Sequence, residues 1–336
     1  DGASVGVMLI GCSRNVHLVG CALRANAKAA MQLSQGADPL VEECTISDGL
    51  GPGLLALDGA RGLLRRNTIK SNRGAGARIE ASMTNLEANT ILDGGDVGVS
   101  ISGVATATAG AAEEDAVGAL AAAGTPDAET SMPPLTGKPS LSEAYGVGGQ
   151  LRAAHVPHPT VAADATRLLV SEAGAQAILR GNEIARNALS GVQVRDGACP
   201  LISENKLYDG HGSGILYCDG SRGVIRDNEL CGHAKTELQM SGARTAPLVQ
   251  GNRIHSSHAG GVLAFDGAAG VLLCNKIYAN ARANIRLSEC ASTHVEGNEV
   301  HASREHGIVI SSGCCSLVVA NDVHANHKAN VAIWGE

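Results

Sequence analysis

The chain repeats itself about every 23 residues, and this period constrains the fold more than any other property of the sequence. An Asn-x-Ile element, with Leu or Val as variants in the third place, occurs nine times between residues 67 and 323. Cys21 and Cys44 stand in the Asn place upstream. Successive anchors are 22 to 24 residues apart, except for one gap of 93 residues between Asn89 and Asn182. A period of this length indicates a solenoid.

Apolar residues recur ten and twelve positions after every anchor, as at Ile215 and Tyr217. A spacing of two predicts a strand with one face turned inward. A second short apolar run precedes the next anchor, and the Asn-x-Ile segment itself is the third. The residue before the first strand is mostly Gly, with Asn at 284 and 330. Both residue types tolerate a positive φ, so we expect a sharp corner there.

Three short strands and three turns in about 23 residues are too few for a βαβ unit, which needs about 30 or more. They fit one rung of a right-handed parallel β-helix, in which rungs stack at about 4.8 Å. We therefore predict an all-β solenoid of about 11–12 rungs, in which the Asn column pairs its side-chain amides up the stack. A narrow lumen filled by aliphatic residues also accounts for an aromatic content of 2%.

One segment breaks the register. Residues 103–165 are rich in Ala, Gly and Pro and carry an excess of acidic residues. Such a segment buries too little apolar surface to offset its ordering entropy. We predict a flexible insertion at one corner, between N-terminal rungs in residues 1–102 and C-terminal rungs in residues 166–336, all within one continuous domain.

Charge and cysteine usage limit the function. The net charge of −7 argues against a nucleic-acid partner, because phosphate-binding surfaces need clustered Lys and Arg. The ten cysteines include one vicinal pair and no C-x-x-C spacing, so they are interpreted as small buried thiols, without a metal site or another cofactor. No apolar run reaches the roughly eighteen residues of a membrane span, so no membrane association is expected.

Equivalent residues of neighbouring rungs stack in columns, so we expect the side chains of a functional site to occupy adjacent places in one column. Three residues after the anchor stand Tyr208, Cys231, His255, Tyr278, His301 and His324. His301 and His324 lie on adjacent rungs and can begin a metal site, although a third ligand is needed. An ordinary stacked corner position is the competing interpretation of this column.

Acidic residues form a second column. Asp196 and Asp219 also occupy adjacent rungs, and a stacked carboxylate pair suits a glycosidase. Each of these Asp residues precedes Gly, however, which is a turn signal. We interpret the column as turn geometry.

The repeats resemble those of a known family. Cys199-Pro200-Leu201-Ile202-Ser203-Glu204-Asn205-Lys206-Leu207-Tyr208-Asp209-Gly210 and the following Gly223-Val224-Ile225-Arg226-Asp227-Asn228 are similar to the β-helix repeats of F-box-only ubiquitin-ligase substrate receptors. The resemblance covers nearly the whole chain outside the insertion. It implies a β-helix that works as the recognition domain of a larger protein.

The complete structural columns, without a convergent set of catalytic groups, favour a non-catalytic scaffold for protein–protein interactions rather than an enzyme. The expected setting is a large cytoplasmic, cytoskeletal or ciliary assembly. Partner proteins, or further residues of the natural chain, are expected to cover an open end of the helix. The alternative is a carbohydrate-active enzyme, a polysaccharide lyase, hydrolase or epimerase, with its site along one outer sheet.

Overall fold

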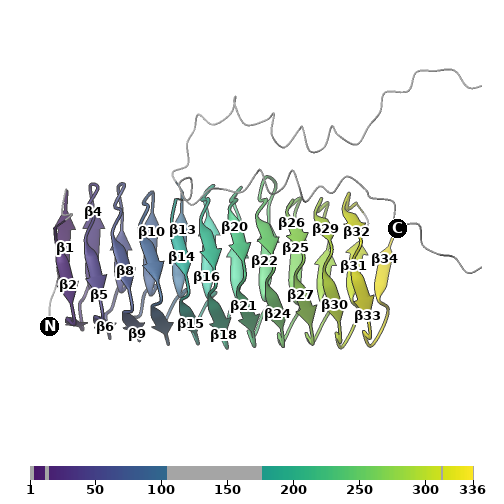
Figure 1. Cartoon of the computed structure of the whole chain (residues 1–336), viewed down its shortest axis with the longest axis horizontal. Helices are drawn as coiled ribbons and strands as arrows, with labels where there is room; N and C mark the ends of the chain where they lie inside the picture. The colour runs from purple at the N-terminus through teal and green to yellow at the C-terminus, as the bar shows by residue number, and fades with distance from the viewer. Residues whose placement is uncertain (1–3, 12–14, 104–175, 312, 336) are drawn as a thin grey trace, which may run out of the picture. The chain divides into compact units, whose positions relative to one another are not determined.

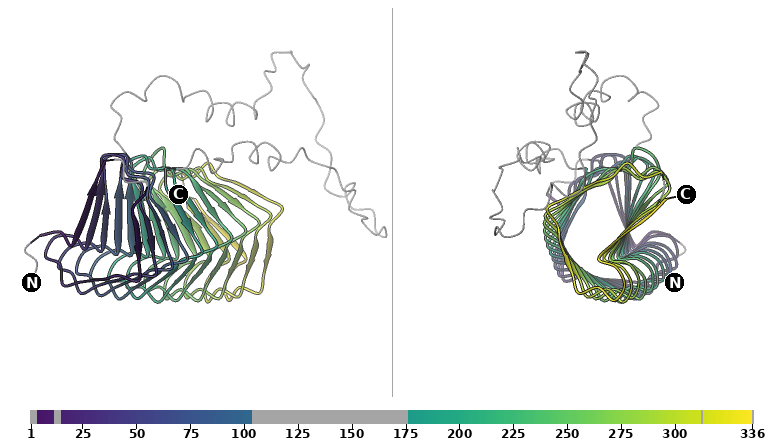
Figure 2. Two further views of the ribbon diagram at one scale, coloured as in Figure 1. Left: turned by 60° about the vertical axis from the view of Figure 1, so that its left-hand side comes forward. Right: turned by 90° about the vertical axis from the view of Figure 1, so that its right-hand side faces the viewer.

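The fold is a parallel β-helix built from three sheets that run the length of the stack (Figure 1). The computed structural model describes residues 4–11, 15–103, 176–311 and 313–335. Each rung contributes one strand to each sheet, and every strand pairs in parallel with its equivalents in the rungs before and after it. Seen along the stack, successive rungs superimpose (Figure 2). The predicted fold class is confirmed.

The first sheet has 12 strands, and the second and third have 11 each. The first contains β1 (Val7–Ile10), β4 (Met31–Ser34), β7 (Leu54–Ala56), β10 (Ala77–Glu80), β13 (Val99–Ser102), β16 (Val192–Arg195), β19 (Ile215–Tyr217), β22 (Leu238–Ser241), β25 (Val262–Phe265), β28 (Ile285–Leu287), β31 (Ile308–Ser311) and β34 (Val331–Trp334).

The second sheet contains β2 (His17–Val19), β5 (Leu40–Glu42), β8 (Leu63–Arg65), β11 (Asn85–Glu87), β14 (Ile178–Arg180), β17 (Leu201–Ser203), β20 (Val224–Arg226), β23 (Leu248–Gln250), β26 (Val271–Leu273), β29 (His294–Glu296) and β32 (Leu317–Val319). The third contains β3 (Ala22–Arg24), β6 (Thr45–Ser47), β9 (Thr68–Lys70), β12 (Thr90–Leu92), β15 (Glu183–Ala185), β18 (Lys206–Tyr208), β21 (Glu229–Cys231), β24 (Arg253–His255), β27 (Lys276–Tyr278), β30 (Glu299–His301) and β33 (Asp322–His324).

The core is the lumen between the sheets. Alternate residues of each strand point inward, and in the central rungs they are fully buried, as at Ile215, Ile225 and Leu230. The middle residue of every three-residue strand in the second and third sheets belongs to this set. Its neighbours on either side point outward, which leaves two outward columns on each of these sheets.

An asparagine ladder holds the corner between the second and third sheets. Each side-chain amide donates to the side-chain oxygen of the next Asn, at 2.9–3.0 Å, and that oxygen also accepts a backbone N–H. The ladder runs through Asn67, Asn89, Asn182, Asn205, Asn228, Asn252, Asn275, Asn298 and Asn321. It satisfies buried backbone groups that the corner would otherwise leave unpaired.

The corners are made by left-handed residues that are mostly not glycine. The residue before each anchor has a positive φ in every described rung, for example 59° at Glu204 and 57° at Asp227. The fourth residue after the anchor is also left-handed, as at Asp209 with 53° and Ala279 with 56°. The stacked ladders on both sides stabilise this conformation against its intrinsic cost.

The glycines before the first-sheet strands have a different role from the one predicted. Gly53 and Gly191 are not among the residues with positive φ. A Cβ at Gly53 would lie 2.7 Å from the carbonyl oxygen of Gly76, and one at Gly191 would lie 2.8 Å from that of Gly214. Close approach of neighbouring rungs, rather than backbone conformation, therefore explains this column.

The predicted insertion of residues 103–165 lies, beyond Gly103, outside the described residues. The rungs that flank it stack directly on one another: β13 pairs with β16, and Asn89 donates to Asn182 at 3.0 Å. Among the described residues, no helix is long and apolar enough to cross a membrane.

Candidate functional site

Four of the predicted column residues form a continuous ring stack on the outer face of the third sheet. His255, Tyr278, His301 and His324 follow one another on β24, β27, β30 and β33. Their ring centroids are 4.8, 5.2 and 5.1 Å apart, and their planes lie within 14° of parallel. Because the ring faces cover one another, the stack presents ring edges to its surroundings.

Tyr208, the fifth predicted residue of this column, lies apart from the stack. Cys231 separates it from His255 in the register of the sheet. The Tyr208 hydroxyl donates to Glu183 at 2.5 Å, and this hydrogen bond raises its pKa. Burial raises the pKa of Cys231 to about 11, so this thiol is neutral near pH 7. Neither side chain is poised for proton transfer.

Charged groups from the second outward column surround the start of the stack. Glu229, on β21, lies 3.3 Å from both Arg253 Nη1 and His255 Nε2. The other guanidinium nitrogen, Nη2, donates to the hydroxyl of Tyr278 at 3.2 Å. That hydrogen bond, with the nearby Glu229 charge, raises the pKa of Arg253, which stays cationic. One carboxylate, one guanidinium, one imidazole and one phenol are thus brought together from three adjacent rungs.

The contacts of His255 indicate its tautomer. Nε2 faces the Glu229 carboxylate, which only accepts, so this nitrogen carries the proton. Nδ1 lies 3.0 Å from the hydroxyl of Ser256, which donates to it. A neutral His255 therefore holds its basic nitrogen on the side of Ser256. This is the arrangement a general base requires.

The far end of the stack is paired differently. Glu299 lies 3.5 Å from His301 and 2.8 Å from Lys276, while Asp322 lies 3.3 Å from His324. The hydrogen bond from Lys276 lowers the pKa of Glu299. Among the described residues, no group of three His, Cys, Asp or Glu side chains is arranged to hold a metal ion, so no third ligand joins His301 and His324.

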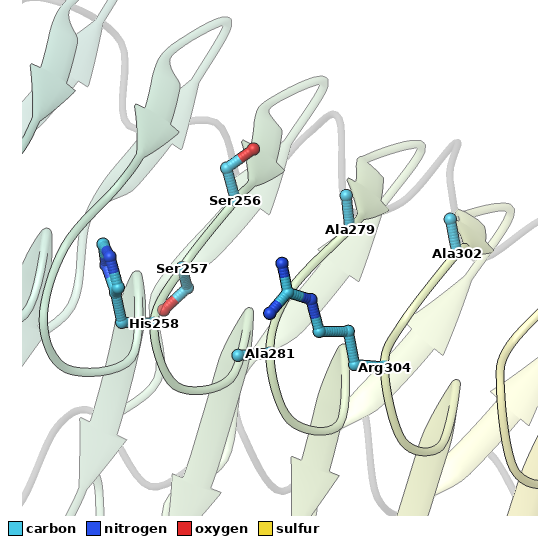
Figure 3. A pocket seen from close by; sticks show the side chains of 7 residues that line it. All are labelled: Ser256, Ser257, His258, Ala279, Ala281, Ala302 and Arg304. Atoms are coloured by element: carbon cyan, nitrogen blue, oxygen red, sulfur yellow. The ribbon is translucent and has the colours of Figure 1, made fainter.

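A shallow groove of about 290 Å³ runs beside the ring stack (Figure 3). Its floor includes Ser256, Ala279 and Ala302, each of which directly follows a ring residue in the sequence. His258 and Arg304 line the far side, and the Arg304 side chain extends from its own rung toward that of Ala281. The groove thus adjoins the ring stack through the residues that follow the rings in the sequence, and its far side carries a cation.

Small residues at one position open the groove. The fourth residue after the anchor is Asp48, Asp93, Arg186 or Asp209 in several earlier rungs, but Gly, Ser or Ala from residue 232 onward. This change of side-chain size is a sequence signal that could have located the groove.

The acidic column lies elsewhere. Asp196 and Asp219 follow β16 and β19, at the corner between the first and second sheets. Their φ angles are 56° and 55°, and each is followed by a glycine with positive φ. Asp196 lies 3.5 Å from Arg195, and Asp219 accepts from the Cys218 thiol at 3.2 Å. These carboxylates belong to turns and are not brought together with the ring stack.

The periodicity did not reveal a buried pair at the corner between the third and first sheets. His233 Nδ1 lies 2.5 Å from Glu237 Oε2, and both side chains are essentially unexposed. Later rungs place Asn280 with Asn284 and Asn326 with Asn330 in the same positions, at 2.8 and 3.1 Å. The pair therefore replaces an Asn–Asn hydrogen bond of the corner. The carbonyl oxygen of His233 accepts the backbone N–H of His258 in the next rung.

Comparison with known proteins identifies the fold family. The family model for the right-handed beta helix region matches residues 1–110, 165–244 and 200–336. No curated protein matches the sequence. The A-module of the mannuronan C-5 epimerase AlgE4 of Azotobacter vinelandii is similar in structure, with a TM-score of 0.60 and 13% identity over 98% of this chain and 83% of that one.

A mutant of the periplasmic alginate epimerase AlgG is also similar, with a TM-score of 0.50 and 13% identity over 91% of this chain. The present chain covers 64% of that protein. Likeness at these identities shows a shared fold. The comparisons do not show the narrower resemblance to F-box-only receptors.

The comparisons do correct the functional expectation. The similar solved structures are polysaccharide-modifying enzymes, so the prediction of a non-catalytic scaffold without enzymatic activity is wrong, and the alternative of a carbohydrate-active enzyme fits better. The prediction rested on the absence of a local catalytic motif. Glu229, Arg253 and His255 make contacts across neighbouring rungs, and a local motif does not reveal contacts of that kind.

Proposed function

The chain belongs to the right-handed β-helix family, and we propose that it is a carbohydrate-active enzyme. Its reaction is the β-eliminative cleavage of a polysaccharide that contains uronic acid, and its site is the groove beside His255 and Tyr278. The observation that carries the proposal is the contact set of Glu229, Arg253, His255 and Tyr278, which adjoins the groove through the contact of His255 with Ser256.

His255 is the base. Its Nδ1 takes the proton from the sugar carbon next to the carboxylate, and Glu229 stabilises the imidazolium that forms, at 3.3 Å from Nε2. Ser256 lines the groove and is the present partner of Nδ1, so substrate entry replaces this hydroxyl contact with the C–H to be broken.

Tyr278 is the acid. Its proton passes to the glycosidic oxygen as the bond from that oxygen to C4 breaks, and the C–H electron pair becomes the C4–C5 double bond. The Arg253 guanidinium, 3.2 Å from the phenol oxygen, stabilises the phenolate that remains. The proton then returns from His255 to Tyr278 through solvent, so the cycle balances without a further reactant.

Arg304 receives the substrate carboxylate. Its guanidinium lines the opposite bank of the groove, where it neutralises the charge that grows on the carboxylate as the proton leaves. The same cation disfavours neutral sugars at this position, because it would then be desolvated without a partner.

The positions of the two proton-transfer groups favour elimination over epimerisation. The rings of His255 and Tyr278 stack on the outer face of the same sheet, 4.8 Å apart, so they approach a bound sugar from one side. Inversion at a carbon needs the acid on the face opposite to the base. Elimination can remove the proton and protonate the leaving group on the same face of the sugar. It therefore needs a base and an acid on one side only.

Hydrolysis is less well supported. A glycosidase needs one carboxyl group that stays protonated, with a raised pKa. The pKa of Glu299 is lowered instead, by its contact with Lys276.

The test is incubation of the full chain with polymannuronate, polyguluronate, polygalacturonate and a neutral β-glucan, followed by ultraviolet absorbance for the conjugated double bond. We expect unsaturated product from at least one polyuronate, none from the glucan, and a loss of about 100-fold or more in His255→Ala. His324→Ala, at the far end of the stack, is the matched control and should retain the rate. Incorporation of solvent deuterium without chain cleavage would instead indicate epimerisation. No reaction with any of the three polyuronates would overturn the proposal.

A further inference from the structure

A row of basic residues follows the corner beside the groove. The row, named here the basic ridge, consists of Lys235, His258, Arg282, Arg304 and Lys328, which stand six or seven residues after the anchors of five successive rungs. All five side chains belong to exposed residues. The ridge stands out because the chain as a whole carries a net charge of −7.

The charge of the ridge is largely uncompensated. Within the described part of the chain, Lys235, Arg282 and Arg304 form no ion pair with a carboxylate. The one acidic residue at these positions, Glu305, lies 3.3 Å from Lys328. A row of like charges without counter-charges repels itself, so it gains free energy from a ligand that brings a row of anions.

The ridge is also rigid before any ligand binds. The buried hydroxyl of Ser257 donates to the carbonyl oxygen of Lys235 at 2.9 Å, and that of Ser303 donates to the carbonyl oxygen of Arg282 at 2.7 Å. The backbone N–H groups of these two serines donate at 3.0 Å to the side-chain oxygens of Asn280 and Asn326, at the corner between the third and first sheets. The loops that carry the cations are therefore fixed to neighbouring rungs, which lowers the ordering cost of binding.

We propose that the basic ridge is a binding track for a linear polyanionic glycan, which runs parallel to the helix axis and extends the groove in both directions. The rungs rise by about 4.8 Å, close to the length of one sugar unit in an extended chain. Each rung thus offers one basic side chain to the carboxylate of one sugar unit. The identification of the polymer as a glycan rests on the proposed function, whereas the anionic character rests on the ridge alone.

Nucleic acid fits the ridge less well. Binding of a single strand relies on aromatic faces on which bases stack. In the ring column beside the groove, the faces of Tyr278 and His301 are covered by their neighbours at 5.2 and 5.1 Å. Tyr278 and His301 therefore present only their ring edges, and these suit hydroxyl and carboxylate groups.

The test is calorimetric titration of the full chain with polygalacturonate and polymannuronate oligomers of two and six units, at low and high salt. We expect the longer oligomers to bind more tightly, and the affinity to fall as salt rises. Lys235→Ala/Arg282→Ala, which leaves the groove residues unchanged, should weaken binding of the longer oligomers about tenfold and reduce the salt dependence. Arg286→Ala is the matched control, because Arg286 is an exposed arginine of the same rung that points out of the first sheet.

Three outcomes would overturn the track: unchanged affinity in the double variant, equal affinity for a neutral glucan, or equal affinity for an oligodeoxythymidylate of the same charge. Failure of the two proposals can be told apart. A chain that binds the polyuronate through Lys235 and Arg282 but never cleaves it retains the track and loses the lyase assignment. A chain that cleaves polyuronate while the double variant binds normally retains the lyase and loses the track.

Discussion

The imidazole of His255 stacks on the phenol of Tyr278 with ring centroids 4.8 Å apart and planes inclined by 13°. The two side chains are 23 positions apart in the sequence and directly paired in the register of β24 and β27. Stacking fixes both rings, while Glu229 and Arg253 fix the polar atoms at their edges. In a solenoid, neighbouring rungs hold the functional side chains in a fixed arrangement. A site built on loops needs additional supporting contacts to reach the same precision.

Removal of the Tyr278 hydroxyl distinguishes the role of this residue as an acid from its role in the ring stack. In Tyr278→Phe the ring remains to cover His255 and His301, but the proton donor and its contact with Arg253 are lost. We expect the rate of polyuronate cleavage to fall about 100-fold or more at unchanged thermal stability. Tyr208→Phe is the control, because that hydroxyl is hydrogen-bonded to Glu183 outside the site. Full activity in Tyr278→Phe would exclude the phenol as the acid.

Glu42 should make stability depend on acid pH. Hydrogen bonds and charges from Arg65, His17 and Arg66 lower its pKa from 4.5 to about 2, against an opposing effect of burial. A lowered folded-state pKa means that the ionised form stabilises the fold. This stability is present above pH 4.5 and is lost as the pH falls toward about 2.

The urea midpoint of unfolding, measured across this range, checks the expectation. Glu42→Gln should lower the midpoint near neutral pH and should show a weaker decline between pH 4.5 and about 2. Glu43→Gln is the control, because the Glu43 side chain is 59% exposed and lies 3.4 Å from Arg66. If the urea midpoint of Glu42→Gln fell with pH as steeply as that of the natural chain, Glu42 would not be the source of the pH dependence.

The asparagine ladder should accept one more rung. Cys44 stands in the Asn place, and its thiol lies 3.6 Å from the Leu18 carbonyl and 3.4 Å from the Cys21 nitrogen. In Cys44→Asn, the amide replaces these weak sulfur contacts with hydrogen bonds of the kind Asn67 makes, and the melting temperature should rise by the equivalent of about 1 kcal/mol. The reverse change, Asn252→Cys, removes buried hydrogen bonds and should lower it. A fall in stability in Cys44→Asn would show that the ladder ends there for a steric reason.

A charge in the lumen should unfold the helix. Ile277 is fully buried, so Ile277→Asp places an unpaired carboxylate among aliphatic side chains and costs several kcal/mol. Circular dichroism on heating measures the loss. Ala325→Asp introduces the same residue at an exposed left-handed position, where other rungs have Asp48, Asp93 and Asp209, and should be tolerated. An equal melting temperature in the two variants would contradict the column assignment.

Some positions have roles that depend on atoms of another rung, which the sequence does not reveal. The glycine column was interpreted through φ, yet the constraint at Gly53 is the carbonyl of Gly76, an atom of another rung. Asp196 and Asp219 have the left-handed φ of turn residues, a local geometry that an Asp-Gly pair indicates by itself. The function was misjudged because the sequence placed His255 and Tyr278 in one column but gave no sign that Glu229 and Arg253 contact them. The rung register and the side-chain conformations bring these four residues together.

The sequence by itself determined the three-sheet helix, the inward columns and the Asn67 to Asn321 ladder, because in a solenoid each residue stacks on its equivalent one period away and the period is written in the chain. The tertiary structure decided what the outward side chains do. The period does not determine side-chain rotamers or corner geometry. These decide that Nδ1 of His255 faces Ser256, that Arg304 extends toward the rung of Ala281, and that His233 pairs with Glu237.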